Sequence, residues 1–142
     1  MQKGYMSKLT DQITIMNDHW RGEKYEYTFK RIYFQNLVND LKKRKIIILT
    51  GPRQTGKTTL MLQMIQNLIE KGISPDKILY FSFDDYIEDP LNVVKEWTKL
   101  NAIRHTDKGY VFFDEIQFID KRARKIKLLH DNMRYLTFII SG

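Results

Sequence analysis

The chain has 142 residues, about the length of one domain, and 42% of them are hydrophobic and 13% aromatic, enough to form a buried core. It contains no cysteine, no apolar run long enough to cross a bilayer and no signal-peptide pattern, which excludes a disulfide framework and predicts a cytoplasmic protein with no membrane partner. The formal net charge of +7 favours polyanionic partners such as a nucleotide, a nucleic acid or an acidic protein, without choosing among them.

The first 29 residues are predicted to form an arm that packs on the rest of the chain. Three apolar residues of this stretch share one helical face: Leu9, Ile13 and Met16. The segment from Asn17 to Gly22 interrupts that spacing and leads into a mixed polar and aromatic stretch. We therefore expect an N-terminal helical arm, residues 1–29, followed by one core domain, residues 30–142.

The core domain is predicted to begin with a helix and to continue as alternating strands and helices. The first helix has one apolar face, formed by Phe34, Leu37, Val38 and Leu41. Short apolar runs predict four strands, at Ile46–Leu49, Ile78–Phe83, Tyr110–Phe113 and Tyr135–Ile140. The intervening helices are predicted from an apolar stripe between Leu60 and Ile69, from Asp89 as N-cap before Pro90, and from a basic stretch, Arg122–Met133.

This alternation predicts an α/β fold with three layers, in which a parallel sheet is covered by helices on both faces. In the helix after Pro90, four residues are expected to face inward: Val93, Val94, Trp97 and Leu100. The chain stops at Ser141-Gly142, directly after an apolar strand, although parallel strands are normally buried. We therefore expect a fragment in which the sheet is incomplete and the C-terminal part of the core is missing.

A glycine-bounded loop between the first strand and the next helix is the strongest functional signal. It fits G-x-x-x-x-G-K-[ST] at every position, with Gly51, Pro52, Arg53, Gln54, Thr55, Gly56, Lys57 and Thr58. The glycines let the backbone curl so that N–H groups as far as Thr59 converge on phosphates, at the positive end of the helix dipole. Lys57 is expected to reach the β- and γ-phosphates, and Thr58 to offer its hydroxyl to Mg²⁺. The loop predicts a P-loop NTPase fold that binds ATP with Mg²⁺.

An acidic pair at the end of the third strand completes the predicted site. Asp114 and Glu115 follow an apolar strand, at the edge of the sheet where ligands of open α/β sheets bind. Asp114 is expected to hold Mg²⁺, directly or through a water, and Glu115 to orient and polarise the attacking water. Ser141, at the end of the fourth strand, is expected next to these acids if the strand order is the usual one for such ATPases. The predicted catalytic residues are Lys57, Glu115 and Ser141, and the predicted metal ligands are Thr58 and Asp114.

Other polar residues have an ordinary structural interpretation beside a functional one. Gln117 could read the nucleotide state or be a loop amide, and we favour the loop amide. The pair Asp84-Asp85 is interpreted as a strand-end turn. A solvated helix face is the default interpretation of the basic residues Lys121, Arg122, Arg124, Lys125 and Lys127.

The motifs together resemble those of the AAA-type ATPases often called archaeal ATPases. The likeness is carried by Leu49–Leu60, Tyr80–Asp85, Phe113–Gln117, His19–Gly22 and Ile139–Gly142. The resemblance implies ATP rather than GTP as nucleotide, dependence on Mg²⁺, and Ser141 as the sensor residue. It also implies further C-terminal domains in full-length members, through which a homo-oligomer could form. In such ATPases, residues before the first strand often flank the base, so we expect the arm around Trp20 to lie near the adenine.

Two functions remain open from the sequence. The first is an ATPase that hydrolyses ATP to ADP and phosphate and thereby drives a conformational change, which the pair Asp114-Glu115 favours. The alternative is an ATP-dependent binding module or switch with negligible turnover, acting on a protein or nucleic-acid partner, which the positive charge favours. A small-molecule kinase would need an acceptor pocket and a basic lid that we do not find, and no Asn-Lys-x-Asp motif points to GTP.

Overall fold

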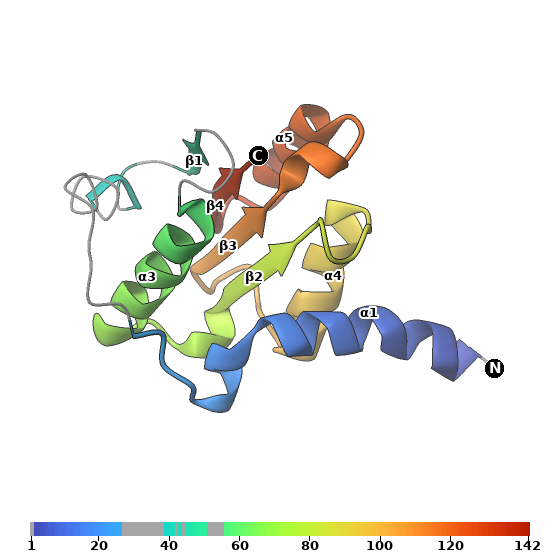
Figure 1. Cartoon of the computed structure of the whole chain (residues 1–142), viewed down its shortest axis with the longest axis horizontal. Helices are drawn as coiled ribbons and strands as arrows, with labels where there is room; N and C mark the ends of the chain where they lie inside the picture. Colours follow the sequence, from blue (N-terminus) through green and yellow to red (C-terminus); the bar gives the residue numbers. More distant parts are fainter. Residues whose placement is uncertain (1, 27–38, 42, 44, 51–55) are drawn as a thin grey trace.

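The computed structural model describes residues 2–26, 39–41, 43, 45–50 and 56–142. Four parallel strands form one sheet in the order β1-β4-β3-β2 (Figure 1). Their bounds are Ile46–Leu49 for β1, Ile78–Ser82 for β2, Gly109–Asp114 for β3 and Leu136–Ser141 for β4. The four strands predicted from apolar runs are thus confirmed within one residue at either end. The boundary predicted between arm and core, and most of the helix predicted around Phe34–Leu41, lie outside the described residues.

Helices precede, separate and cover these strands. The α-helices are α1, Gln2–Met16; α3, Lys57–Glu70; α4, Pro90–Leu100; and α5, Arg122–Asn132. Three short 3-10 helices are η1, Asp18–Arg21; η2, Pro75–Lys77; and η3, Ile116–Phe118. Within the part of the chain that the structure describes, no helix is long and apolar enough to span a membrane.

The sheet separates two hydrophobic cores, because side chains of successive strand residues point to opposite faces. On one face, α1, α4 and α5 pack against a core that includes Leu79, Phe81, Val111, Phe113 and Phe138. On the other face, α3 packs against a core that includes Tyr80, Tyr110, Phe112 and Ile139. The expected α/β fold with three layers and a parallel sheet is confirmed (Figure 1).

The start of α4 follows its sequence signals, but the predicted burial of its last residue is wrong. The carboxylate of Asp89 accepts a hydrogen bond from the Leu91 N–H at 2.9 Å, and Pro90 occupies the first helical position. Val93, Val94 and Trp97 are fully buried, whereas Leu100 is 42% exposed. Leu100 ends the helix, so no further turn of α4 shields it from solvent.

The apolar sequence of β1 predicted a strand covered on both faces, but one of its faces is open to solvent. Ile48 is 66% exposed and lines a hollow of about 260 Å³ between β1 and α5, together with Ile126 and Ile140. β1 is an outer strand of the described sheet, and α3 covers only the face that carries Ile47 and Leu49. An apolar run therefore predicted the strand correctly but not the burial of each of its residues.

The outer edge of β2 is covered by side chains of the arm. Asn17 is fully buried; its Nδ2 donates to the Tyr80 carbonyl at 2.8 Å, and its Oδ1 accepts from the Tyr80 N–H at 2.7 Å. A side-chain amide here replaces the pairing that a neighbouring strand would give. Met16 Sδ accepts from the Ser82 N–H at 3.4 Å, two residues further along the same edge. The prediction that the first residues pack on the core is confirmed for α1 and η1.

His19 and Trp20 bind the amino end of the same edge. His19 Nε2 and Trp20 Nε1 both lie 2.8 Å from the Ile78 carbonyl oxygen. Because a carbonyl only accepts, Nε2 of His19 carries a proton, and Nδ1 is left to accept from the Tyr25 hydroxyl at 2.8 Å. Burial lowers the pKa of His19, which favours the neutral ring. Trp20 thus lies at the amino end of β2, whereas phosphate-loop residues follow the carboxyl end of β1, which gives no support to a position near the adenine.

Candidate functional site

The described part of the phosphate-loop motif lies at the N-terminus of α3. Gly56 precedes the helix with φ 80°, a left-handed conformation that glycine adopts without strain, and its carbonyl accepts from the Leu60 N–H at 2.9 Å. Lys57 is the first helical residue and is half-buried. The remaining predicted loop residues, Gly51 to Thr55, lie outside the described residues. The first N–H groups of α3 and the positive end of its dipole therefore face the segment in which the motif predicts a phosphate site.

Thr58 joins this helix to the acidic strand end. Its hydroxyl donates to Asp114 Oδ2 at 2.5 Å, although the two residues are 56 positions apart in sequence. Thr58 is exposed, whereas Asp114 is only 2% exposed. The structure thus brings together the two predicted metal ligands, with the threonine on the solvent side of the aspartate.

Three further groups donate to the Asp114 carboxylate. The Tyr80 hydroxyl donates to Oδ2 at 2.7 Å. Oδ1 accepts from the Ser141 hydroxyl and from the Glu115 N–H, the latter at 3.1 Å. Each carboxylate oxygen therefore has two donors, which compensates for removing this side chain from water. The expectation that Ser141 lies next to the acids is confirmed by β4 lying between β1 and β3.

The strand registers explain why these side chains meet. Tyr80 is paired with Phe112, so Asp114 is the diagonal neighbour of Tyr80 on the same face of the sheet. Ile139 is paired with Phe112 on the other side, which places Ser141, two residues later, on that face as well. Long aromatic side chains reach diagonal neighbours in sheets. These side chains therefore meet on the face of the sheet that α3 covers, toward the carboxyl ends of β2, β3 and β4.

The environment of Tyr80 keeps its hydroxyl a hydrogen-bond donor. Tyr80 is 8% exposed, and burial, followed by the neighbouring Asp114 carboxylate, raises the pKa of its phenol far above the usual range. Both effects disfavour a phenolate. The phenol is thus protonated near neutral pH and can donate to Asp114.

Glu115 has an unusual backbone and a defined partner. Its φ of 56° places it in the left-handed region, which is uncommon for a residue with a side chain. Oε1 of Glu115 accepts from Nε2 of Gln117 at 2.5 Å, across the start of η3. Gly142 packs against this turn, since a Cβ at 142 would meet Gln117 Oε1 and the backbone nitrogens of Ile116 and Gln117. Gln117 is thus bound to the predicted catalytic acid within the same turn, and its interpretation as a loop amide stays a prediction.

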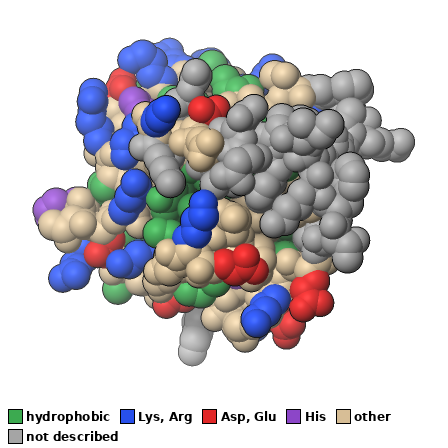
Figure 2. Space-filling model, turned by 90° about the vertical axis from the view of Figure 1, so that its left-hand side faces the viewer, with side chains coloured by type: hydrophobic (Ala, Val, Ile, Leu, Met, Phe, Trp, Pro, Cys, Tyr) green, Lys and Arg blue, Asp and Glu red, His purple; other side chains and the backbone are tan. Residues whose placement is uncertain are grey.

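Two other polar groups of the sequence have partners of their own, although the Asp84 carboxylate lies near enough to help raise the pKa of the Tyr80 phenol. Asp84 is exposed and accepts a hydrogen bond from the Ser82 hydroxyl at 2.5 Å, as a strand-end turn would. On α5, Lys125 lies 3.7 Å from Asp89 and Lys127 lies 2.8 Å from Asp131. Figure 2 shows lysine and arginine side chains along the upper left border of one face, interspersed with acidic ones. The interpretation of α5 as a solvated basic face therefore agrees with its contacts.

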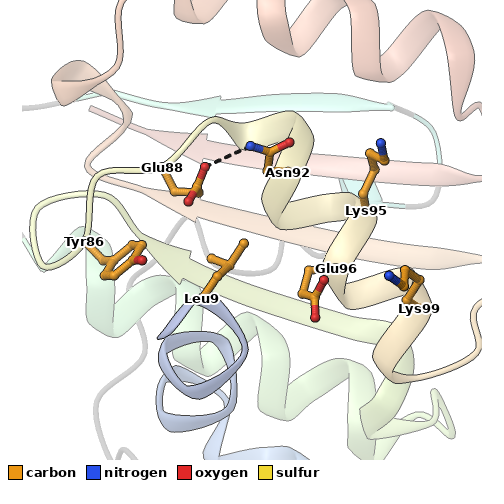
Figure 3. A pocket seen from close by; sticks show the side chains of 7 residues that line it. All are labelled: Leu9, Tyr86, Glu88, Asn92, Lys95, Glu96 and Lys99. Carbon is orange, nitrogen blue, oxygen red and sulfur yellow. Dashed lines mark hydrogen bonds between the residues drawn. The ribbon is translucent and has the colours of Figure 1, made fainter. Parts of the chain in front are cut away.

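A separate hollow of about 280 Å³ lies between α1 and α4 and shares no residue with the Asp114 cluster (Figure 3). It is lined by Leu9, Tyr86, Glu88, Asn92, Lys95, Glu96 and Lys99. Glu88 accepts from Asn92 Nδ2 at 2.9 Å, and Glu96 accepts from the Thr10 hydroxyl at 2.8 Å. Its charges are of both signs, and its two acids already accept hydrogen bonds from Asn92 and Thr10.

The oxygen atoms of the Asp114 cluster fit Mg²⁺ better than a transition metal. No group of three or more histidine, cysteine or acidic side chains suited to a metal occurs within the described ranges. Magnesium bound with a nucleotide does not need one, because it keeps several waters and takes one or two protein oxygens together with the phosphates. Thr58 and Asp114 supply that small set.

Comparisons with known proteins agree with this arrangement. A protein-family model described as an AAA domain matches residues 43–142, which hold the whole sheet and every predicted site residue. The chain is also 28% identical over 91 residues to a protein of Haemophilus influenzae that is described only as uncharacterized. That alignment covers 62% of this chain and 23% of the relative, so the chain spans less than a quarter of the length of that relative. No solved structure matches the chain.

Proposed function

The chain belongs to the AAA domain family, whose members bind nucleotides, and from this premise we propose that it binds ATP with Mg²⁺ and hydrolyses it to ADP and phosphate, driving a conformational change. The single observation that carries the proposal is the hydrogen bond of 2.5 Å between Thr58 and Asp114 at the N-terminus of α3. It joins the phosphate-loop motif to the acidic strand end, as a site for a metal-bound phosphate requires.

The direction of that hydrogen bond suits a magnesium ligand. Because the Thr58 hydroxyl gives its proton to Asp114, both of its lone pairs remain available to a cation. Asp114 is almost fully buried behind it, so we propose that Asp114 acts on the ion mainly through Thr58 or a water. Magnesium bound there would neutralise charge on the phosphates, and Lys57 with the backbone N–H groups of Gly51 to Thr59 would do the same from the loop.

Glu115 is the proposed group that orients the attacking water. It is half-buried at the carboxyl end of β3, next to Asp114. In this structure Gln117 occupies its Oε1, so a water would have to use Oε2 or displace Gln117. Ser141, which also lies 3.4 Å from the Glu115 N–H, would keep the backbone of the acid pair in place as the nucleotide state changes.

The Glu115–Gln117 hydrogen bond also favours a second candidate function. While Gln117 binds the Glu115 carboxylate, that carboxylate is poorly placed to accept a proton from water. Slow hydrolysis of this kind is what a nucleotide-dependent switch with negligible turnover would show. In that case ATP would set the conformation for a protein or nucleic-acid partner. Assignment to the archaeal type of ATPase, formation of a homo-oligomer and a cytoplasmic location belong to the same proposal for the whole protein.

The test is Mg²⁺-dependent phosphate release from ATP, with nucleotide affinity measured by calorimetry. We expect turnover by the wild type, loss of affinity in Lys57→Ala, and tight binding without turnover in Glu115→Gln. Lys71→Ala and Glu70→Gln are matched controls, because both residues are exposed at the end of α3 and should leave both quantities unchanged. Binding without turnover in the wild type would support the switch, and no binding of ATP with Mg²⁺ would overturn both candidates.

A further inference from the structure

We infer that Tyr80 is a positioning residue for the metal site: its hydroxyl holds the Asp114 carboxylate so that Asp114 in turn orients Thr58 toward the cation. The inference rests on the proposed function. It adds a residue on β2, a strand that carries neither the phosphate-loop motif nor the acidic pair. The contact on which it depends is the 2.7 Å hydrogen bond from the Tyr80 hydroxyl to Asp114 Oδ2.

Tyr80 and Thr58 share one oxygen of Asp114. Oδ2 accepts from Thr58 at 2.5 Å and from Tyr80 at 2.7 Å, while Ser141 and the Glu115 N–H donate to Oδ1. Rotation of the carboxylate about its last bond would disturb all four contacts together. Without the Tyr80 hydroxyl, the one donor left to Oδ2 among the described residues would be Thr58, the group that must also serve the cation.

The ring of Tyr80 is itself fixed, so its hydroxyl has a defined position. The side chain lies in the core between the sheet and α3, and its backbone N–H and carbonyl are both bound by Asn17 of the arm. A contiguous line of hydrogen bonds therefore runs from Asn17 through Tyr80 to Asp114. A positioning residue needs such support, because a mobile donor would not restrict its acceptor.

The Tyr80 hydroxyl can be removed with little change to packing. Phenylalanine keeps the ring that fills this core and deletes only one oxygen. Tyr110 offers a matched control: it lies on β3 in the same core, is 4% exposed, and sits next to Ile78 rather than to Asp114. Loss of a hydrogen bond to a buried charged group typically changes an equilibrium by roughly tenfold.

The experiment compares ATP affinity with saturating Mg²⁺ and with EDTA for the wild type, Tyr80→Phe and Tyr110→Phe. In EDTA, we expect Tyr80→Phe to bind ATP with the wild-type affinity. Its gain in ATP affinity on adding Mg²⁺ should be roughly tenfold smaller than that of the wild type. Tyr110→Phe should keep the full gain. An unchanged gain in Tyr80→Phe would overturn the inference, whereas absence of any gain in the wild type would instead contradict the proposed function.

A double-mutant cycle separates positioning from a general loss of structure. If Tyr80 acts through Asp114, adding Tyr80→Phe to Asp114→Ala should cause no further loss of the Mg²⁺-dependent gain. Fluorotyrosine labelling gives an independent readout in the otherwise unmodified chain, since the ¹⁹F resonance absent from Tyr80→Phe identifies Tyr80. We expect that resonance to shift when Mg²⁺ is added to the ATP complex. Additive losses in the cycle, or a resonance that does not respond to Mg²⁺, would contradict a positioning role.

Discussion

Two groups of hydrogen-bonded polar side chains lie on opposite sides of β2, and they are built differently. On the outer edge, Asn17 and His19 bind backbone groups of β2, and each hydrogen bond to the strand joins one neutral group to another. On the inner side, four donors converge on one carboxylate, that of Asp114, and one of them, Thr58, is exposed to solvent.

The difference indicates how a structural polar cluster can be told from a functional one. The outer group completes the hydrogen bonding of a sheet edge, which would otherwise be open to other strands. The inner group surrounds one buried charge with donors and leaves one of them, Thr58, facing solvent, which the hydrogen bonding of the sheet itself does not require. Variants of the outer group should therefore lower the stability of the protein, and variants of the inner group should change ligand binding.

The largest effect on stability is expected from Asn17→Ala. The change removes both hydrogen bonds to Tyr80 and leaves a buried N–H and a buried carbonyl without partners. We expect a loss of about 2–4 kcal/mol in the free energy of unfolding, measured by urea denaturation. Asn92→Ala is the control, because Asn92 is exposed on α4 and its side chain donates to Glu88 in a solvent-exposed hydrogen bond; the change should cost less than about 0.5 kcal/mol. Equal losses in the two variants would remove the distinction drawn for the arm.

The opposite pattern is expected from Asp114→Asn. The amide keeps the size of the side chain but removes the charge, so the gain in ATP affinity on adding Mg²⁺ should fall by roughly tenfold or more. The free energy of unfolding should change by less than in Asn17→Ala, because the hydroxyls of Thr58 and Tyr80 can turn to accept from an NH2 group at the Oδ2 position, while Oδ1 still accepts from Ser141 and the Glu115 N–H. Calorimetry with Mg²⁺ and with EDTA, followed by urea denaturation, measures both quantities. A large loss of stability with an intact Mg²⁺ response would show that Asp114 belongs with the structural cluster.

Much of the fold could be predicted from the sequence because its signals are local. Continuous apolar runs gave the four strands, and Asp89-Pro90 gave the start of α4. The errors at Ile48 and Leu100 have a common cause. Their exposure depends on where the strand or helix ends up relative to the rest of the sheet, which apolar patterning does not encode.

The candidate site shows the same limit. The loop motif is one unbroken stretch of sequence, and the two acids are another. Thr58, Asp114 and Glu115 could therefore be found without a structure. Tyr80 could not, because its contact with Asp114 depends on the pairing of β2 with β3 and on both side chains pointing to the α3 face. The role of Asn17 depends in turn on β2 being an outer strand, which only the order of the strands reveals.

The smallest expected effect concerns pH and His19. Its pKa is lowered in the folded protein, first of all by burial, so the folded state binds fewer protons than the unfolded state when the pH falls below about 6.5. The stability that His19 contributes is therefore complete above that pH. Below it, this stability is lost as the pH approaches the folded pKa, by no more than about 1.4 kcal/mol per pH unit.

Urea denaturation of the wild type and His19→Gln at several pH values between 7.5 and 5.5 measures this loss. Glutamine can still donate to the Ile78 carbonyl but does not titrate, so the variant should show a shallower decline than the wild type. His105→Gln is the control for replacing a histidine by glutamine, because His105 is exposed. The free energy of unfolding could instead decline with falling pH equally in His19→Gln, His105→Gln and the wild type. The arm would then cover β2 without requiring His19 to be neutral.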